Sequence, residues 1–234
     1  MLLALDTASE TCGVALVHDG SVIERAEVVG QRHSERLLPM IEALLAEAGV
    51  SLRQLDAVAF GAGPGSFTGL RISCGVAQGI AYAIDRPVVP VGNLQALAFN
   101  AARRVPAAQR VAAAIDARMG ECYWAVYAAD SSSAELLPPA LSRAEDLADA
   151  LRGAAPDLLA GEAFSVFSSH LDGLPATYRR PEATATAAAI AQLGVAALQA
   201  GRAVDPALAA PHYVRNRVAQ TTEERQALRA ARAA

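Results

Sequence analysis

The stretch GAGPGSFTGLRI, residues 61–72, combines residue types that hold phosphate groups in many nucleotide-binding proteins. Gly61, Gly63 and Gly65 leave the backbone free to adopt unusual conformations or to approach another group closely. Ser66 can cap the helix predicted after the glycines, and the free N–H groups of a helix N-terminus attract anions. The first question is therefore whether this loop binds a nucleotide or packs against the protein itself.

Three phosphate-binding or catalytic loop motifs do not fit this stretch. A P-loop requires G-x-x-x-x-G-K-[ST], and the stretch contains no lysine. A dinucleotide fingerprint, G-x-G-x-x-G, would need its third glycine where Ser66 or Thr68 stands. A hydrolase elbow, G-x-S-x-G, would need glycine in place of Pro64 and Thr68. Tight packing, which we favour, and anion binding at the helix N-terminus remain as alternatives.

A repeated pattern places an aspartate after a buried run twice in the chain. The apolar run that ends at Asp6 is followed by Cys12 and an alternating strand, and the same pattern recurs at Asp116 and Cys122. A strand, an acidic turn and a return strand that occur twice predict two similarly folded halves. Two common hairpins that resemble each other by chance are the alternative. Each aspartate could simply bond the backbone of its own turn.

Composition excludes several classes of protein. The chain has 234 residues, 53% of them hydrophobic, and 20 basic against 24 acidic residues, so no global charge draws it to nucleic acid or to an anionic membrane. It lacks an uninterrupted apolar run of about 18 residues and a basic, signal-like N-terminus, which predicts a cytoplasmic protein without a membrane span. Its three cysteines are widely spaced, and we expect them to be buried rather than paired or zinc-bound.

The elements that must position these residues alternate between strand and helix, which predicts an α/β fold. The stretch 130–142 is loop-like, and Ser34 is the expected cap of the first helix. The segment from Pro211 onward is expected to form a partly ordered tail. Strands are predicted at 2–7, within 12–29, at 56–63, 87–91, within 111–128 and at 156–164, and helices at 34–48, 66–83, 93–103, 142–153 and 183–200.

Five segments together resemble one family, the TsaB or YeaZ proteins of bacterial tRNA threonylcarbamoyladenosine biosynthesis. They are LALDTAS, HSERLLP, GPGSFTGLR, IDARMGECYWAVY and PHYVRN, and the likeness runs from residue 1 to about residue 218. The resemblance implies the actin-like ATPase superfold (sugar kinase, hsp70 and actin, ribonuclease H-like), with two duplicated domains flanking a cleft. Residues 1–105 would form the first domain, 106–210 a smaller second domain, and 211–234 a C-terminal segment and tail.

The resemblance also implies a function. The family acts in N6-threonylcarbamoyladenosine formation on the adenosine after the anticodon of ANN-decoding tRNAs. Its members are non-catalytic subunits that bind and activate the catalytic paralogue TsaD together with the ATPase TsaE, and that reach tRNA through the complex. TsaD holds a metal through an HxxxH motif, whose positions correspond here to Asn93 and Leu97, so we expect no metal site. An independent actin-like ATP-binding enzyme or a peptidase-like hydrolase is the alternative.

In the superfold, Asp6 and Asp116 would occupy the positions of carboxylates that reach nucleotide-bound metal. No catalytic residue and no cofactor are expected, apart from ATP or ADP at the junction with TsaD. The candidate residues of such a vestigial nucleotide site are Asp6, Gly63, Gly65 and Ser66.

In this family, partners pair through two helices of the first domain, and the isolated protein forms a homodimer with the same surface. The first of these helices has a wide apolar stripe, about half of which we expect to pack on its own sheet. The second carries small residues that permit close approach of another helix. The arginine-bearing tail could contact tRNA phosphates or remain solvated. The candidate interface residues are Leu37, Leu38, Ile41, Leu44, Leu45, Ile72 and Val76.

Overall fold

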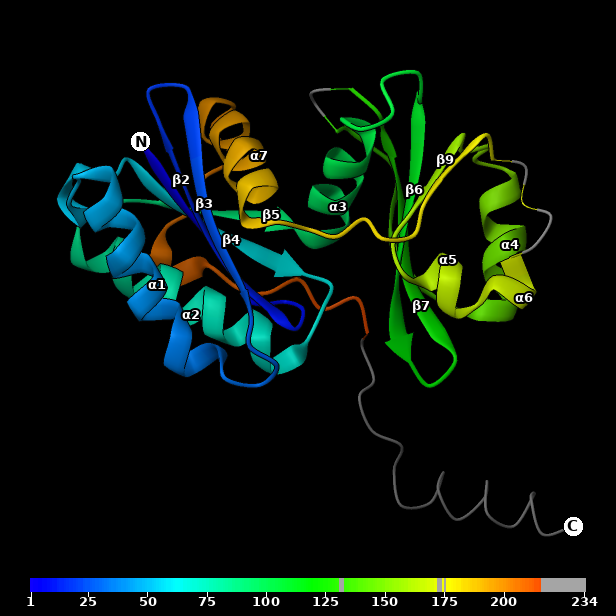
Figure 1. The fold of residues 1–234 in the computed structure, drawn as a ribbon, viewed down its shortest axis with the longest axis horizontal. Helices are drawn as coiled ribbons and strands as arrows, with labels where there is room; N and C mark the ends of the chain where they lie inside the picture. The colour runs from blue at the N-terminus through cyan, green and yellow to red at the C-terminus, as the bar shows by residue number, and fades with distance from the viewer. Residues whose placement is uncertain (131–132, 172–173, 175, 216–234) are drawn as a thin grey trace, which may run out of the picture.

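The chain folds into two five-stranded mixed sheets with helices on both faces of each (Figure 1), in a computed structural model that describes residues 1–130, 133–171, 174 and 176–215. The first sheet has the order β3-β2-β1-β4-β5 and the second the order β10-β9-β6-β7-β8. The strands of the first sheet are β1 (Leu2–Asp6), β2 (Thr11–His18), β3 (Ser21–Val28), β4 (Ala57–Gly63) and β5 (Val88–Gly92). Those of the second are β6 (Arg110–Arg118), β7 (Glu121–Ala128), β8 (Glu135–Arg143), β9 (Leu158–Ala160) and β10 (Tyr178–Arg180).

The two sheets repeat one topology, which confirms the predicted duplication. In the first half, β1 pairs antiparallel with β2 and parallel with β4, while β2 continues to β3 and β4 continues to β5. In the second half, β6 pairs antiparallel with β7 and parallel with β9, while β7 continues to β8 and β9 continues to β10. Asp6 and Asp116 lie at equivalent places, on the first strand of each half where it reaches the return strand.

Each half ends in a helix that covers the sheet of the other half. The helix α3 (Asn93–Ala102) follows β5 of the first sheet but packs mainly on β6, β7 and β9 of the second. The helix α7 (Ala187–Gln199) follows β10 of the second sheet but packs on β1, β2, β4 and β5 of the first. The two helices also contact each other, so the halves are joined by an exchange of helices in addition to the chain connections.

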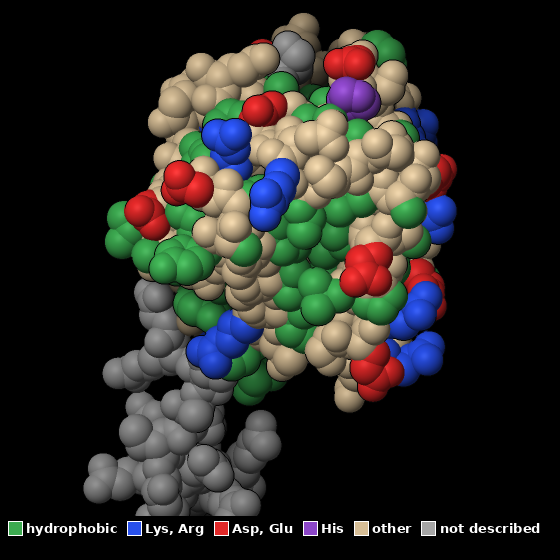
Figure 2. Space-filling view, turned by 90° about the vertical axis from the view of Figure 1, so that its left-hand side faces the viewer, with side chains coloured by type: hydrophobic (Ala, Val, Ile, Leu, Met, Phe, Trp, Pro, Cys, Tyr) green, Lys and Arg blue, Asp and Glu red, His purple; other side chains and the backbone are tan. Residues whose placement is uncertain are grey.

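The remaining helices cover the outer faces of the sheets. The helices α1 (His33–Ala48) and α2 (Phe67–Ala83) cover the first sheet, and Figure 2 shows hydrophobic side chains gathered across the middle of the side on which they lie. The second sheet is covered by α4 (Ala144–Arg152), with the short helices α5 (Ala163–Val166) and α6 (Ser168–Leu171) beside it. Two 3-10 turns, η1 (Leu52–Gln54) and η2 (Pro206–Leu208), complete the first half.

Local chemistry explains where several elements begin. Ser66 is the N-cap of α2, as predicted, because its side-chain oxygen accepts the N–H of Gly69. The helix α7 begins only at residue 187, because Thr186 caps it by accepting the N–H of Ala189. The prediction of a helix from residue 183 was therefore too long. The prediction that Ser34 caps α1 was wrong: α1 begins at His33, and its N-cap Arg32 makes no side-chain capping bond.

The predicted loop at 130–142 is in part a strand. Residues 135–143 form β8, which pairs with β7 at the edge of the second sheet. Pro138 and Pro139 hid this strand, because proline lacks the N–H that a central strand must donate. An edge strand tolerates the missing donor on its open side.

The cysteines are free and buried, as predicted. Burial raises the pKa of the Cys12 thiol to about 11 and that of Cys122 to about 12, so neither is a reactive thiolate at neutral pH. None of the helices in the described part of the chain has the length and apolar character that crossing a bilayer requires.

We predict that Gly194→Leu lowers the free energy of unfolding, because it disturbs the packing of α7 on the first sheet. A Cβ atom at this position of α7 would lie 2.9 Å from the Cβ of Ala59 and 3.4 Å from a methyl group of Leu2. Overpacking of this kind costs about 1–3 kcal/mol, so the urea midpoint of unfolding should fall. The control is Ala196→Leu, on the exposed side of the same helix. Equal midpoints for the two variants would contradict the tight packing of α7 on β1 and β4.

Candidate functional site

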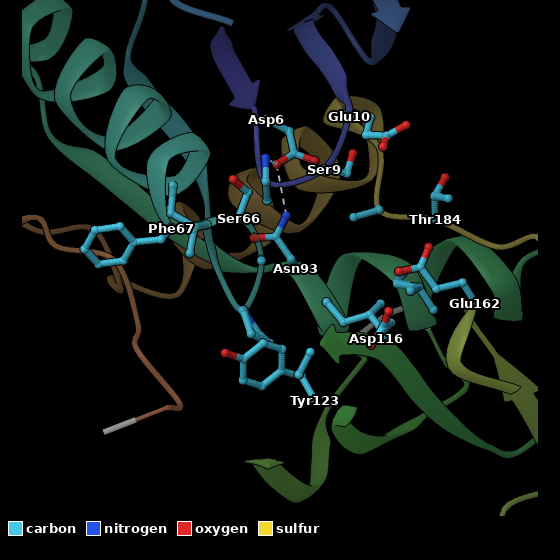
Figure 3. A pocket seen from close by; sticks show the side chains of 18 of the residues that line it. Asp6, Ser9, Glu10, Ser66, Phe67, Asn93, Asp116, Tyr123, Glu162 and Thr184 are labelled. Carbon is cyan, nitrogen blue, oxygen red and sulfur yellow. Dashed lines mark hydrogen bonds between the residues drawn. The ribbon is translucent and has the colours of Figure 1, made fainter. Parts of the chain in front are cut away.

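A cavity of about 710 Å³ lies between the two halves of the molecule (Figure 3). The first half contributes the turn after β1, the loop before α2 and the start of α3, and the second half contributes the β6–β7 hairpin and the segment before α7. The chain's C-terminal segment, up to residue 215, forms another wall. The carboxyl ends of β1, β4 and β5 thus meet at the cavity, which is where open α/β sheets bind ligands.

Asp6 is the most buried charged group of the cavity wall. Its carboxylate oxygen Oδ1 accepts the N–H of Ala8 at 3.1 Å and the side-chain amide of Asn93 at 3.0 Å. The Asn93 Oδ1 in turn accepts the N–H of Gly63 at 2.7 Å. One amide side chain therefore ties together the ends of β1 and β4 at the first residue of α3, and sequence reasoning had treated Asn93 only as a lost metal ligand.

Burial changes the acidity of Asp6. Loss of solvation raises the pKa of this carboxyl to about 6, against the opposing effect of the hydrogen bonds from Ala8 and Asn93. The carboxyl is therefore partly protonated near neutral pH. Burial disfavours the ionised form of this carboxyl, and its Oδ1 already accepts two hydrogen bonds, so Asp6 is a weaker metal ligand than a solvated carboxylate.

A glycine of the loop before α2 and one in the first turn of α2 are positions of close packing. A Cβ on Gly65 would lie 2.7 Å from the carbonyl oxygen of Ala8, and one on Gly69 would lie 1.8 Å from the carbonyl oxygen of Thr7. The N–H of Ser66 donates to the Ala8 carbonyl at 2.8 Å. These contacts support the packing alternative, because part of the helix N-terminus is directed at the β1–β2 turn.

Of the four candidate nucleotide-binding residues, Asp6, Gly65 and Ser66 line the cavity. Gly63 lies behind it, with a left-handed φ of 115° and its N–H bound to Asn93. The structure therefore brings the four residues into one region. Nucleotide binding by them stays a prediction.

Charged groups of the β6–β7 hairpin and of the C-terminal segment are already paired. The Asp116 carboxylate accepts the N–H of Arg118 at 2.7 Å and also binds its guanidinium at 3.3 Å, so it bonds its own turn. Arg215 pairs with Glu121 at 2.5 Å. The carboxylates that line the cavity are Asp6, Glu10, Asp116 and Glu162, and its arginines are Arg118 and Arg215.

This lining bears on nucleotide binding. Both lining arginines are engaged by carboxylates, and the chain contains no lysine. A polyphosphate would meet excess negative charge here and would need a cation, or a basic group from another chain, to balance it. Of the two residues that the resemblance implied would stand in place of a metal motif, Asn93 is hydrogen-bonded on both sides and Leu97 is buried.

The predicted interface residues divide into two groups. Leu38 is 51% exposed, and Ile72 and Val76 of α2 are partly exposed, so these three can meet a partner. The other four do not reach the surface: they are Leu37, Ile41, Leu44 and Leu45, and each is at most 7% exposed. Their assignment to an interface was wrong, because they form the core between α1 and the first sheet.

The predicted tail falls largely outside the described residues. Its proposed contact with tRNA involved residues 219–234, which the structure does not describe. The described part, up to residue 215, packs on α2 and on the β6–β7 hairpin, and sequence reasoning did not anticipate either contact. No local sequence pattern indicates these two contacts, because they join residues about a hundred or more positions apart.

Comparisons with known proteins agree on one family. The family model for TsaD, tRNA N6-adenosine threonylcarbamoyltransferase, matches residues 25–224. The tRNA threonylcarbamoyladenosine biosynthesis protein TsaB of Haemophilus influenzae is 51% identical over 123 residues, which are 53% of this chain and 52% of that protein. TsaB of Escherichia coli is 48% identical over 131 residues, 56% of each chain. The chain thus aligns with about half the length of these curated relatives.

A solved structure covers more of the chain. It is an uncharacterized protein with similarity to peptidase YeaZ from Pseudomonas aeruginosa, 41% identical, with a TM-score of 0.83 over 92% of this chain and 99% of that one. Together with the duplicated topology, these matches confirm the expected fold class, the actin-like ATPase superfold.

Two glycines of α2 should respond oppositely to the same substitution. Gly69→Ala places a methyl group against the Thr7 carbonyl and should destabilise the protein by about 3 kcal/mol. Gly75→Ala meets no atom within 4 Å and should stabilise it by about 0.5–1 kcal/mol, because alanine favours a helix. Urea unfolding measures both. Similar changes of the same sign would contradict the close packing of the first turn of α2 on the Thr7 carbonyl.

Asp6 should impose a pH dependence on stability. The folded chain holds the proton up to about pH 6, whereas the unfolded chain releases it near an ordinary pKa of about 3.9. The unfolded state therefore binds fewer protons between these values, and the free energy of unfolding falls as the pH rises, by about 3 kcal/mol in all.

The variant Asp6→Asn tests this dependence, because its carbonyl oxygen can accept the same two hydrogen bonds without titrating. Relative to this variant, the wild-type protein should lose stability from pH 4 to pH 7 in a urea-unfolding series. A difference that stays constant over this range would show that Asp6 does not hold its proton in the folded chain.

Proposed function

Because this chain belongs to the TsaD family and, within it, to the TsaB or YeaZ branch, we propose that it is a non-catalytic subunit of tRNA threonylcarbamoyladenosine modification. In this proposal it binds and activates a catalytic TsaD subunit, acts with the ATPase TsaE, and reaches tRNA through the complex. The modified base is the adenosine after the anticodon of ANN-decoding tRNAs. In the absence of TsaD, the same surface forms a homodimer.

The observation that carries this proposal is the open face of α2. Gly75 and Gly79 are exposed, and a Cβ atom on either would meet no atom of the described residues within 4 Å. Glycine inside a helix costs about 1 kcal/mol relative to alanine, and the chain's own packing does not require it at these two positions. A second helix packed closely on this face would use both, since small residues let helix backbones approach.

The surroundings of these glycines are suited to a partner. Ile72 and Val76 flank them on α2, Tyr82 is 80% exposed near the end of the helix, and Leu38 of α1 is 51% exposed. Hydrophobic side chains gather on this side of the molecule, with charged groups interspersed among them (Figure 2). We call Leu38, Ile72, Gly75, Val76 and Gly79 the partner face.

The donor set of the cavity supports a non-catalytic role. Metal ligation at the position of Asn93 would break its bonds to Asp6 and Gly63, and Leu97 offers no donor atom. Among the described residues, no group of three or more histidine, cysteine or acidic side chains is arranged to hold a metal ion. Catalysis is therefore assigned to TsaD, with any ATP or ADP held at the junction of the two proteins.

The alternative of a peptidase-like hydrolase has less support from the site. Ser66 is used as a helix cap, and the described cysteines are buried with a raised pKa. A nucleophile needs an exposed position and a neighbouring base. An independent ATP-binding enzyme would have to balance the acidic lining of the cavity by itself.

Bulk on the partner face should abolish complex formation. Gly79→Leu places a large side chain in open space, so the fold should remain stable while TsaD can no longer approach. We expect loss of binding to TsaD in calorimetry and loss of tRNA modification in a reconstituted assay. The partner-face variant Ile72→Asp should have a similar effect, whereas Leu44→Asp would unfold the core and cannot serve as a test.

Gly153→Leu is the matched control, because this glycine lies at the end of α4 in the other half and also faces open space. It should bind TsaD and support modification as the wild-type chain does. Full modification with Gly79→Leu, or by TsaD without this chain, would refute the proposed function.

A further inference from the structure

The C-terminal segment of the described chain runs along α2 and ends at the second half. We call residues 204–215 the strap. It begins with a bridge between Val204 and Val88 at the edge of the first sheet, where each N–H donates to the other carbonyl. In Figure 1 it is the orange segment that passes from α2 towards the β6–β7 hairpin.

Side chains of α2 hold the strap along the length of the helix. The Gln78 amide donates to the carbonyl oxygens of Pro206 at 2.9 Å and Ala209 at 3.1 Å. Arg71 donates from Nε to the hydroxyl of Tyr213 at 3.0 Å, and the Tyr213 ring lies 5.6 Å from that of Phe67. The strap is thus fixed at both ends of the helix that carries the partner face.

The far end of the strap is held by the second half. Arg215 donates from Nη2 to the carbonyl oxygen of Ala117 at 3.0 Å and to Glu121 at 2.5 Å, and its guanidinium lies 5.8 Å from the ring of Tyr123. The side chains of Arg215 and Glu121 are 20% and 33% exposed, so water screens this pair less than it screens an exposed ion pair.

Between these anchors, the strap crosses the loop before α2 and borders the cavity. The N–H of His212 donates to the carbonyl oxygen of Ala62 at 2.7 Å. His212, Tyr213 and Arg215 all line the cavity. One continuous segment therefore contacts the partner-bearing helix, the loop at the end of β4, and the hairpin on the opposite wall.

We propose that the strap couples the partner face of α2 to the cavity between the halves, so that a helical partner docked on α2 tightens the hold of the two halves on each other. The proposal rests on the proposed function for the identity of that partner. The exposed Leu208, in a turn that contacts α2, extends the apolar surface beside the helix, so a partner covering α2 also meets the strap. Coupling of this kind is reciprocal: a partner that tightens the halves binds better to the tightened form.

The hold of the strap on the second half is tested first on the isolated chain. Nitroxide labels at Ser21→Cys and Asp146→Cys mark the exposed surfaces of the two halves, away from α2 and the strap. The native cysteines are buried and should not react with the label. Electron–electron double resonance then gives the distribution of distances between the halves.

The variant Arg215→Ala should broaden this distribution and move it to longer distances, because it removes the contact of the strap with the second half. The matched control is Arg118→Ala, which removes an arginine of the β6–β7 hairpin whose ion pair, among the described residues, is with the nearby Asp116. The control should retain the wild-type distribution. A wild-type distribution in Arg215→Ala would overturn the proposal.

The coupling is tested by adding TsaD. Wild-type chain should bind it with a narrowing of the distance distribution. The variant Gln78→Ala, which removes two of the hydrogen bonds that hold the strap on α2, should bind but show a smaller narrowing. Retention of the full response by Gln78→Ala would overturn the coupling. Failure of the wild-type chain to bind TsaD would refute the proposed function and the coupling together. The measurement on the isolated chain shows in either case whether the strap holds the two halves together.

Discussion

The exchange of helices between the two halves is the constraint on which the rest of the structure depends. Because α3 leaves the first sheet and packs on the second, its first residue must lie where the sheets face each other. That residue is Asn93, and its amide joins Asp6 to the N–H of Gly63. The wall of the cavity is therefore built at the point where the chain crosses from one half to the other, and a change in the packing of α3 would disturb both at once.

The same helix, α2, uses glycine in two different ways. Gly69 faces inward, and its missing side chain lets the helix approach the carbonyl of Thr7 after β1. Gly75 and Gly79 face outward into open space. The inward glycine fixes the helix close to the sheet, and this gives the outward glycines a defined place on the surface. A face that is to receive another helix needs such a fixed position, because ordering a mobile helix on binding would weaken association.

The sequence allowed prediction of those features that leave a local or repeated pattern. The repeat of Asp6 and Cys12 at Asp116 and Cys122 predicted the duplication, because equivalent strands keep equivalent residues at their ends. The apolar stripe of α1 predicted that these side chains are buried, but it did not indicate which surface buries them. Leu37 and Leu44 were therefore assigned to a partner, although their own sheet covers them. The bond between Asn93 and Asp6 and that between Arg215 and Ala117 span 87 and 98 residues, and a contact at such a separation has no local signature.

The two aspartates at or near the end of the first strand of each half are bonded within the protein itself. Asp6 bonds the backbone of its own turn and the side chain of Asn93, and Asp116 bonds its own turn and Arg118. These bonds stabilise the ends of β1 and β6 where the two halves face the cavity. The partner face lies instead on the outside of α1 and α2, and the strap is the segment that contacts both α2 and the wall of the cavity. In the coupling that we propose, a partner on α2 therefore acts on the cavity through the strap.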